Sequence, residues 1–402
     1  MAKRATRITA QRASFLLLLA VITPANADQT DQFLDQHWQR PIPAQGKVPK
    51  HYSALEASLA PEDCGTCHTK QYQDWSQSLH SKAMGPGLMG QLVDMPAHAR
   101  GDHQSCLRCH APLAEQADAL VREIETGQQQ GLHRQGLICA ACHVRQHQRY
   151  GPKRRDGTTP ADNLPLPHNG WQVSDAFEDS RFCATCHQFE ADEFSLNGKL
   201  LENTYNEWLD SDYSRRGVSC QNCHMPDRKH QWKGIHDPQM VRQGVDISAR
   251  IHSLEKQTID ASVTIKNSNT GHRFPTYVTP QVVLEGYQQD QQGDRIDGTE
   301  SYFVVARRVA LNLSQEIFDT RLAPGQTATL SYQQIRHPQA AVFVAKVWVQ
   351  PDFFYQQFYQ SALDSNATQR GKEELQQALR EVSESRYTLF EQQLNFYEIQ
   401  QH

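Results

Sequence analysis

The cysteines constrain this sequence most, because all ten belong to one repeated pattern. The pattern is C-x-x-C-H, and it occurs five times with no cysteine left over. The copies are Cys64-Gly-Thr-Cys67-His68, Cys106-Leu-Arg-Cys109-His110, Cys139-Ala-Ala-Cys142-His143, Cys183-Ala-Thr-Cys186-His187 and Cys220-Gln-Asn-Cys223-His224. Zinc sites and redox-active dithiols also use C-x-x-C spacing, but neither needs a histidine after every second cysteine. Paired zinc ligands would also come in an even number of units.

C-x-x-C-H is the attachment pattern of haem c. Two thiols three positions apart lie on one side of a short turn and can bond to the two vinyl groups of one porphyrin. The histidine that follows can then ligate the iron as its proximal ligand. We therefore expect five covalently bound haem c groups. Their apolar surface would also explain the mean hydropathy of -0.68, which leaves few side chains for an ordinary core.

The first residues read as a secretory signal peptide. Basic residues precede an apolar run over residues 15–22, and Ala25-Asn26-Ala27 has the form of a cleavage site. We expect cleavage after Ala27, and a protein in the periplasm or on the extracellular face. No apolar run of about 18 residues follows residue 30, so we expect no membrane-spanning segment in the mature chain.

After about residue 245 the cysteines end and strand-like patterns begin, which predicts a multidomain protein. We expect a pentahaem domain of helices and irregular loops over 28–244, with little sheet. Alternation in residues 259–265 and several short apolar runs predict an antiparallel β-sandwich over 245–362. The apolar stripe Leu375, Leu379, Val382, Leu389, Phe390 and Leu394 predicts a C-terminal amphipathic helix within 363–402.

A second, distal ligand decides what each haem can do, and histidine is the main candidate. His80 lies on the apolar face of a helix predicted directly after the first motif. His168 lies in a proline-rich loop, and His272 lies in the rigid stretch NTGHRFPTY. After the fifth motif either His230 or His236 is expected to serve, and we prefer His236. The methionines are weaker candidates, so we expect mainly bis-histidine ligation.

The stretch CGTCHTKQYQDWSQSLHSKAM resembles the opening of the cytochrome c-554 family. GLICAACHVR and GVSCQNCHMPDRKHQWKGIHD are similar to further haem units of the same class. The resemblance covers roughly residues 55–240, and it implies that His80 is a distal haem ligand. The broader class includes electron carriers and, more distantly, hydroxylamine oxidoreductases. The family's name-giving cytochrome has four haem motifs, and this chain has five.

Tyr213 stands where a comparison with the segment around His80 would place a histidine. Trp208-x-x-Ser211-x-Tyr213, before the fifth motif, repeats the spacing Trp75-x-x-Ser78-x-His80 with tyrosine in place of histidine. The residues Trp208 to Tyr213 can be a packing helix. Alternatively, one haem has lost its distal ligand, and Tyr213 positions a substrate beside it.

These features favour an exported pentahaem cytochrome that relays electrons between other redox proteins, its donor and its acceptor. The alternative is an oxidoreductase acting on a small nitrogen or sulfur species at one five-coordinate haem; which of the two applies decides whether the protein is an enzyme. A third hypothesis is that the protein is a subunit of an extracellular conducting filament. The sequence does not determine whether the protein forms oligomers. A net charge of -5 argues against a nucleic-acid partner bound by a basic face.

Overall fold

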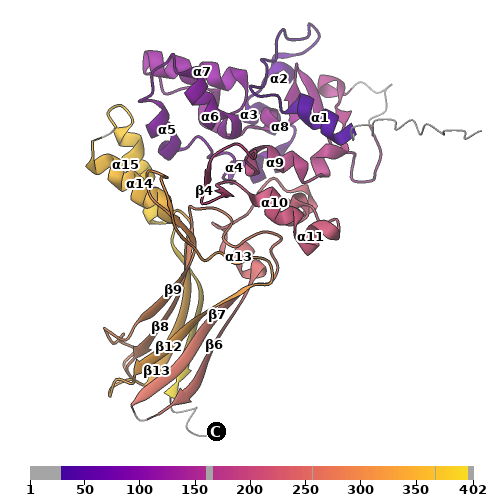
Figure 1. Ribbon diagram of the computed structural model, residues 1–402. Helices are drawn as coiled ribbons and strands as arrows, with labels where there is room; N and C mark the ends of the chain where they lie inside the picture. Colours follow the sequence, from indigo (N-terminus) through magenta and orange to yellow (C-terminus); the bar gives the residue numbers. More distant parts are fainter. Residues whose placement is uncertain (1–28, 160–165, 256, 367, 397–402) are drawn as a thin grey trace, which may run out of the picture.

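The structure is a computed structural model and describes residues 29–159, 166–255, 257–366 and 368–396. The expected signal peptide, residues 1–27, lies outside these ranges. A helical part carries all five C-x-x-C-H motifs, and a long β-sandwich extends away from it (Figure 1). This arrangement confirms the predicted multidomain fold with a helical N-terminal region and C-terminal antiparallel sheets.

The helical part is built from short segments. Its α-helices are α1 (Gln29–His37), α2 (Ala54–Ala57), α3 (Pro61–Gly65), α4 (Thr69–Ser76), α5 (Pro86–Leu92), α6 (Arg100–His110), α7 (Ala114–Thr126), α8 (Cys139–His143), α9 (Arg181–His187), α10 (Thr204–Leu209), α11 (Asp212–Arg215), α12 (Cys220–His224) and α13 (Pro238–Gly244). Its 3-10 helices are η1 (Leu132–Gln135), η2 (Pro167–Asn169), η3 (Asp175–Glu178) and η4 (Pro226–Arg228). Its strands are β1 (Val144–Arg145), β2 (Gln148–Gly151), β3 (Gln172–Val173), β4 (Ser195–Leu196) and β5 (Lys199–Leu200).

The sandwich consists of two antiparallel sheets and a two-stranded ribbon. Its strands are β6 (Val245–Leu254), β7 (Thr258–Asn267), β8 (Gln281–Gln289), β9 (Ser301–Val305), β10 (Arg307–Val309), β11 (Glu316–Asp319), β12 (Thr327–Ile335), β13 (Val342–Gln350) and β14 (Tyr387–Asn395). The sheet orders are β12-β7-β6 and β14-β13-β8-β9, and β10 pairs with β11. The alternating residues Ile259, Ala261, Val263 and Ile265 of β7 are buried between the sheets, as their period of two predicts.

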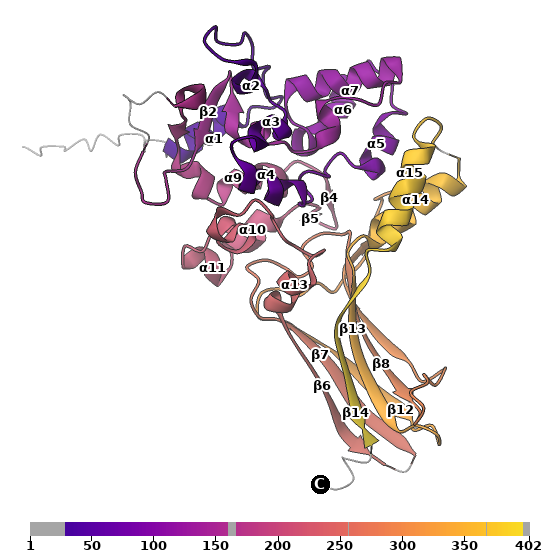
Figure 2. The ribbon, with the colours of Figure 1, turned by 180° about the vertical axis from the view of Figure 1, so that it is seen from behind.

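The C-terminal segment differs from its prediction. Helices α14 (Phe353–Asp364) and α15 (Lys372–Ser383) form a hairpin, and the chain then returns as β14. Figure 2 shows β14 beside β13, where Val349 pairs with Tyr387 and Val342 with Asn395. A single amphipathic helix over 363–402 is therefore wrong beyond α15. The apolar residues after α15 instead form β14, which pairs with β13 along its edge. The local sequence does not reveal this pairing, because strand formation depends on the neighbouring strand.

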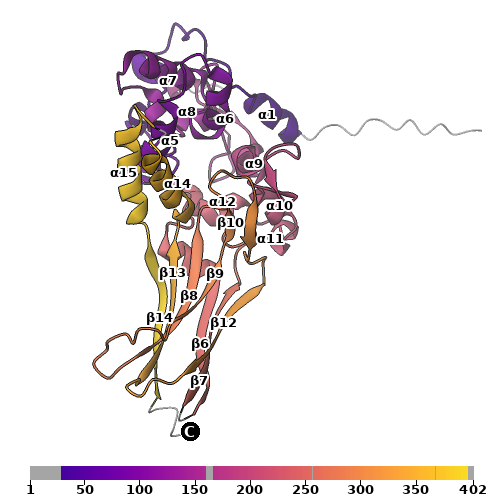
Figure 3. The same cartoon turned by 60° about the vertical axis from the view of Figure 1, so that its left-hand side comes forward.

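The α14–α15 hairpin is fastened to the helical part, alongside α5 (Figure 3). The Asp94 carboxylate accepts hydrogen bonds from the Thr368 hydroxyl at 2.5 Å and from the Arg370 backbone N–H at 2.8 Å. The backbones of Gly90 and Gly371 touch, so that a Cβ on Gly371 would lie 1.8 Å from the Gly90 carbonyl oxygen. Only glycine fits at this crossing.

Replacing Gly371 with alanine should therefore force the hairpin away from α5. We expect the free energy of unfolding to fall by roughly 3 kcal/mol, because the clash is with backbone that cannot rotate away. The matched control is Gly101→Ala on α6, where a Cβ meets no atom within 4 Å. Urea unfolding of both variants tests the contact, and a Gly371→Ala protein as stable as Gly101→Ala would contradict it.

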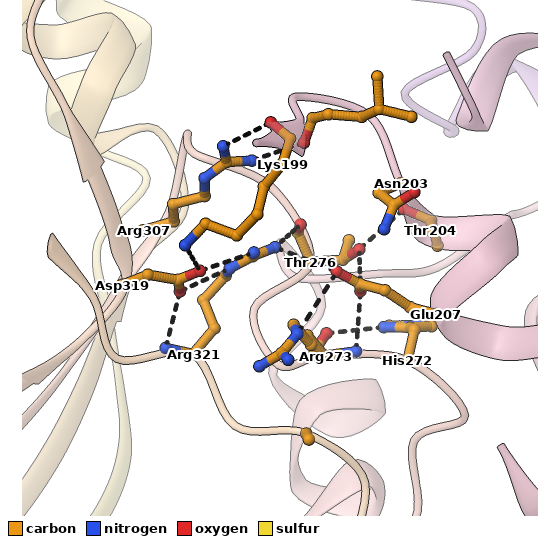
Figure 4. Close-up of polar contacts among 12 residues, drawn as sticks. Lys199, Asn203, Thr204, Glu207, His272, Arg273, Thr276, Arg307, Asp319 and Arg321 are labelled. Atoms are coloured by element: carbon orange, nitrogen blue, oxygen red, sulfur yellow. Dashed lines mark hydrogen bonds and ion pairs between the residues drawn. The ribbon is translucent and has the colours of Figure 1, made fainter. Parts of the chain in front are cut away.

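A buried polar network joins the sandwich to the helical part (Figure 4). The Arg307 side chain of β10 is only 1% exposed, and it donates to the carbonyl oxygens of Lys199 at 2.9 Å and Leu200 at 2.6 Å. In return, Lys199 Nζ lies 2.7 Å from the Asp319 carboxylate. Arg321 pairs with Asp319 at 2.9 Å. The contact between the two parts is therefore held by charge-assisted hydrogen bonds.

This network should lose its strength in acid. Burial by itself raises the pKa of Asp319. The hydrogen bonds from Arg321 and Lys199 outweigh this effect and hold the pKa well below its usual range. A carboxylate with a lowered pKa stabilises the fold above its unfolded pKa of about 4 and loses that contribution as pH falls further. We expect Asp319→Asn to destabilise the protein by roughly 2 kcal/mol at pH 7.

The difference between wild type and Asp319→Asn should shrink below about pH 4, where this carboxylate begins to take up a proton in the unfolded chain while it stays ionised in the folded protein. Thermal unfolding of both proteins from pH 3 to pH 8 measures it. A stability difference that stays constant over this whole range would show that the Asp319 charge is not what holds the contact.

Candidate haem sites

Four of the C-x-x-C-H motifs lie each within one helix, namely α6, α8, α9 and α12. The first motif starts in α3 and ends with His68 as the N-cap residue of α4. Residues at positions i, i+3 and i+4 share a helix face, so the two cysteines and the histidine of a motif point the same way. All ten cysteines are free thiols, as attachment of a cofactor requires.

Three proximal histidines are oriented by backbone carbonyl groups. The Nδ1 atoms lie 2.6 Å from the Ala83 oxygen for His110, 2.8 Å from the Tyr150 oxygen for His143 and 2.7 Å from the Lys233 oxygen for His224. An Nδ1–H that donates to a carbonyl oxygen fixes the tautomer and leaves Nε2 free to ligate a metal. His187 differs, since its Nδ1 lies 2.5 Å from the Tyr277 hydroxyl.

Three of the proximal histidines face a second histidine ring. The ring centres of His187 and His80 are 6.3 Å apart, those of His143 and His230 are 6.2 Å apart, and those of His224 and His272 are 6.3 Å apart. Two imidazoles that bind one iron from opposite sides, each with a bond of about 2 Å, place their centres about 6 Å apart. The spacing of all three pairs therefore fits a haem iron between the rings.

The facing residues are also kept in the form that binds a metal. Burial lowers the pKa of His80 to about 3, and it lowers the pKa of His187 to about 4. Neutral imidazole is the ligating form, so both rings are ready at neutral pH. The Nδ1 atoms of His230 and His272 lie 3.0 Å and 2.8 Å from backbone carbonyl oxygens, which again leaves Nε2 free.

His168 lies within electrostatic range of His68, the proximal histidine of the first motif. Burial lowers the pKa of His168, and the charges of Arg149 and His68 act in the same direction. His168 has a positive φ of 45°, and its loop is held by the Tyr52 hydroxyl, which donates to the His168 carbonyl oxygen at 3.0 Å. Its Nδ1 lies 2.8 Å from the Gly170 oxygen. A side chain held in a strained backbone conformation is typical of a functional site.

Neither His68 nor His110 has a facing histidine ring in the part of the chain that the structure describes, and the second motif differs from the first in the groups around it. Glu202 lies near Cys109, and burial raises the pKa of this carboxyl group to about 8. One of its oxygens is buried and has no hydrogen-bond partner in the described ranges. The Tyr355 side chain of α14 is close to both Cys106 and Glu202. A protonatable group and a phenol therefore lie beside this motif.

Around the fifth motif, two residues named from the sequence lie differently from what the sequence suggests. His236 does not face a proximal histidine, because its Nε2 lies 2.9 Å from the Asp352 carboxylate. His230 takes the position opposite His143 instead, so the pairing is with the third motif. At the fifth motif the ring that faces His224 is that of His272, and not the side chain of Tyr213.

The motifs lie close to one another. The thiols of different motifs come within interaction distance in three places, namely Cys64 with Cys139, Cys109 with Cys186 and Cys183 with Cys220. The first motif therefore adjoins the third, and the fourth adjoins both the second and the fifth. Cys142 of the third motif also lies within electrostatic range of Cys183 and Cys186. The fourth motif is thus the neighbour of three others.

Comparisons with known proteins agree with this reading of the motifs. Residues 63–144 match the family model described as cytochrome c554 and c-prime. The chain is 24% identical over 247 residues to the cytochrome c-type protein TorY of Haemophilus influenzae, an alignment that covers 61% of this chain and 56% of TorY. It is 26% identical over 187 residues to cytochrome c-552 of Aliarcobacter butzleri, covering 42% of this chain and 36% of that protein. The chain thus spans about half or less of these relatives.

The crystal structure of a penta-heme cytochrome c552 from Thermochromatium tepidum has a similar fold. The TM-score is 0.56 at 18% sequence identity, and the match covers 86% of this chain and 100% of the other. Among the described residues, no helix combines the length and the apolar character that crossing a membrane needs.

Proposed function

Since the chain is a multihaem c-type cytochrome, we propose that it holds five haem c groups, one on each C-x-x-C-H motif, and relays electrons between redox proteins. Each haem iron supplies one-electron storage by alternating between the ferrous and ferric states. The protein's own contribution is to hold the haems close together, to set their ligands and to exclude water.

The observation that carries this proposal is the set of facing histidine rings. We propose the axial pairs His187–His80, His143–His230, His224–His272 and, from proximity, His68–His168. An iron with two imidazole ligands has no position left for a substrate, which suits electron transfer. Histidine in place of methionine also lowers the reduction potential.

The proposed path follows the neighbouring motifs. Electrons would pass between the haems of the first and third motifs, and the fourth motif would connect these with the second and the fifth. The acidic chain would favour a basic face on its partner proteins. We further propose export through the signal peptide over residues 1–27, to the periplasm or the extracellular face.

Rapid reduction of the oxidised protein tests the relay. A sub-stoichiometric pulse of reductant should be followed by spectral changes whose rates do not depend on protein concentration, because the electron redistributes within one molecule. Rates that rise in proportion to concentration would mean that transfer occurs only between molecules, and the relay would be excluded.

A second function is favoured by one specific observation, the absence of a facing histidine at His110 among the described residues. A haem with an open position can bind a small molecule, such as the nitrogen or sulfur species of the alternative function. Glu202 and Tyr355 would then be groups able to carry protons near the attachment cysteines of that haem. Titration with carbon monoxide distinguishes the cases: binding to one haem per chain supports the open site, and no binding excludes it.

A further inference from the structure

The proposed axial pair of the fifth motif spans two domains. His224 belongs to α12 in the helical part, whereas His272 belongs to the loop between β7 and β8 of the sandwich. Their ring planes are 17° apart, at a centre distance of 6.3 Å. The position of the β7–β8 loop relative to the helical part therefore decides whether His272 can face His224.

From the sandwich side the loop is held by Asn267, the last residue of β7. This side chain is completely buried, and its amide donates to the His272 carbonyl oxygen at 2.9 Å and to the Leu322 carbonyl oxygen at 3.0 Å. The Thr270 hydroxyl donates to the same His272 oxygen at 2.8 Å. These bonds fix the shape of the loop but not its distance from the helical part.

From the helical side the loop is held by Glu207 of α10 (Figure 4). The Glu207 carboxylate accepts the backbone N–H of Arg273 at 3.0 Å, one residue beyond His272. Its second oxygen lies 3.3 Å from a guanidinium nitrogen of Arg321, a side chain that is 3% exposed. The Glu207 side chain is itself only 8% exposed, so water competes little for these bonds.

Packing supports the same contact. A Cβ on Gly271 would lie 3.1 Å from the Trp208 ring and 3.3 Å from the Tyr213 side chain, so the loop rests directly on α10 and α11. Tyr213 thus forms part of the surface that carries the loop. The loop is also bonded to α13, because the backbone N–H groups of Ser268 and Asn269 donate to the Gly244 carbonyl oxygen at 3.2 Å and 3.0 Å. Glu207 is the group of the helical part that bonds to the backbone directly next to His272.

We infer that Glu207 is the positioning residue for His272, and that it couples the sandwich domain to the coordination of the fifth haem. This inference rests on the proposed axial pair His224–His272. The Glu207 carboxylate pulls the loop toward α12 through the Arg273 N–H, and Arg321 holds the carboxylate in place. Without the Glu207 carboxylate, the loop keeps the bonds of Asn267 and its bonds to Gly244, but it loses the hydrogen bond directly next to His272 that holds this residue toward His224.

The test compares Glu207→Ala with Glu207→Gln, which keeps one acceptor for the Arg273 N–H. The control is Glu285→Ala on β8, because its carboxylate is also buried (5% exposed) and paired with an arginine. Each purified holoprotein is examined by EPR for high-spin iron. We expect Glu207→Ala to convert up to about one fifth of the iron to the high-spin form. Added imidazole should reverse this change, and Glu207→Gln and Glu285→Ala should stay close to wild type.

His272→Ala separates failure of the inference from failure of the proposed ligand pair. If His272→Ala gains high-spin iron and Glu207→Ala does not, Glu207 has no positioning role and the inference is overturned. If His272→Ala itself gains none, the proposed pair is wrong as well. A gain of high-spin iron in Glu285→Ala equal to that in Glu207→Ala would also overturn the inference, because it would reflect general loosening.

Discussion

Replacing His230 with alanine should convert about one fifth of the haem iron from low-spin to high-spin, and make that fraction bind carbon monoxide. The reason is that His230 faces His143 at 6.2 Å, while its Nδ1 is held by the Arg228 carbonyl. Loss of the ring would leave the third haem with one protein ligand. EPR and optical spectra of the oxidised and reduced protein measure the change.

His236→Ala is the matched control, because His236 follows the same motif by only a few residues more. Its Nε2 pairs with Asp352, so its removal should cost some stability and leave all iron spectra unchanged. A high-spin fraction in His236→Ala together with an unchanged spectrum in His230→Ala would reverse the assignment and restore the ligand preferred from the sequence.

Removing the fourth haem should have the largest effect on the whole molecule. In the double variant Cys183→Ala/Cys186→Ala we expect four haems in place of five, a loss of roughly 5 kcal/mol or more in stability, and slow redistribution of electrons. The physical reason is the position of this motif, whose thiols contact Cys220 and Cys109. Its haem would fill the space between three other motifs.

The double variant Cys64→Ala/Cys67→Ala provides the comparison. It also removes one haem, but the thiol contact of this first motif is with Cys139 of the third motif. Haem content, thermal unfolding and the redistribution rate after a pulse of reductant are measured for both. If the two variants lose stability and rate equally, the fourth haem is not the junction of the path.

The prediction of haem attachment sites rests on a purely local pattern. It needs only two thiols and a histidine within five positions, and no contact between distant segments. The spacing also singled out His80, although the predicted helix is too long: α4 ends at Ser76, and His80 lies in the turn after it. Even so, the structure places it opposite His187 of the fourth motif. Helix periodicity identifies a candidate ligand, but not the haem to which it belongs.

The remaining features depend on contacts between distant segments. Nothing local distinguishes His230 from His236, because each follows the fifth motif in a short polar loop. The structure separates them through Asp352, which is more than a hundred residues away. The sequence predicts a helix where the structure has the strand β14, for a related reason. Its apolar residues fit a helical stripe, but their pairing with β13 decides the conformation.

The proposed ligand pairs give four haems two histidine ligands each and leave the haem of the second motif with one. EPR of the fully oxidised mature protein, with the haem content counted on the same sample, measures this directly. We expect five haems per chain, about four fifths of the iron low-spin, and about one fifth high-spin and responsive to cyanide. Five low-spin haems would contradict the open position at His110, and two or more high-spin haems would contradict the proposed pairs.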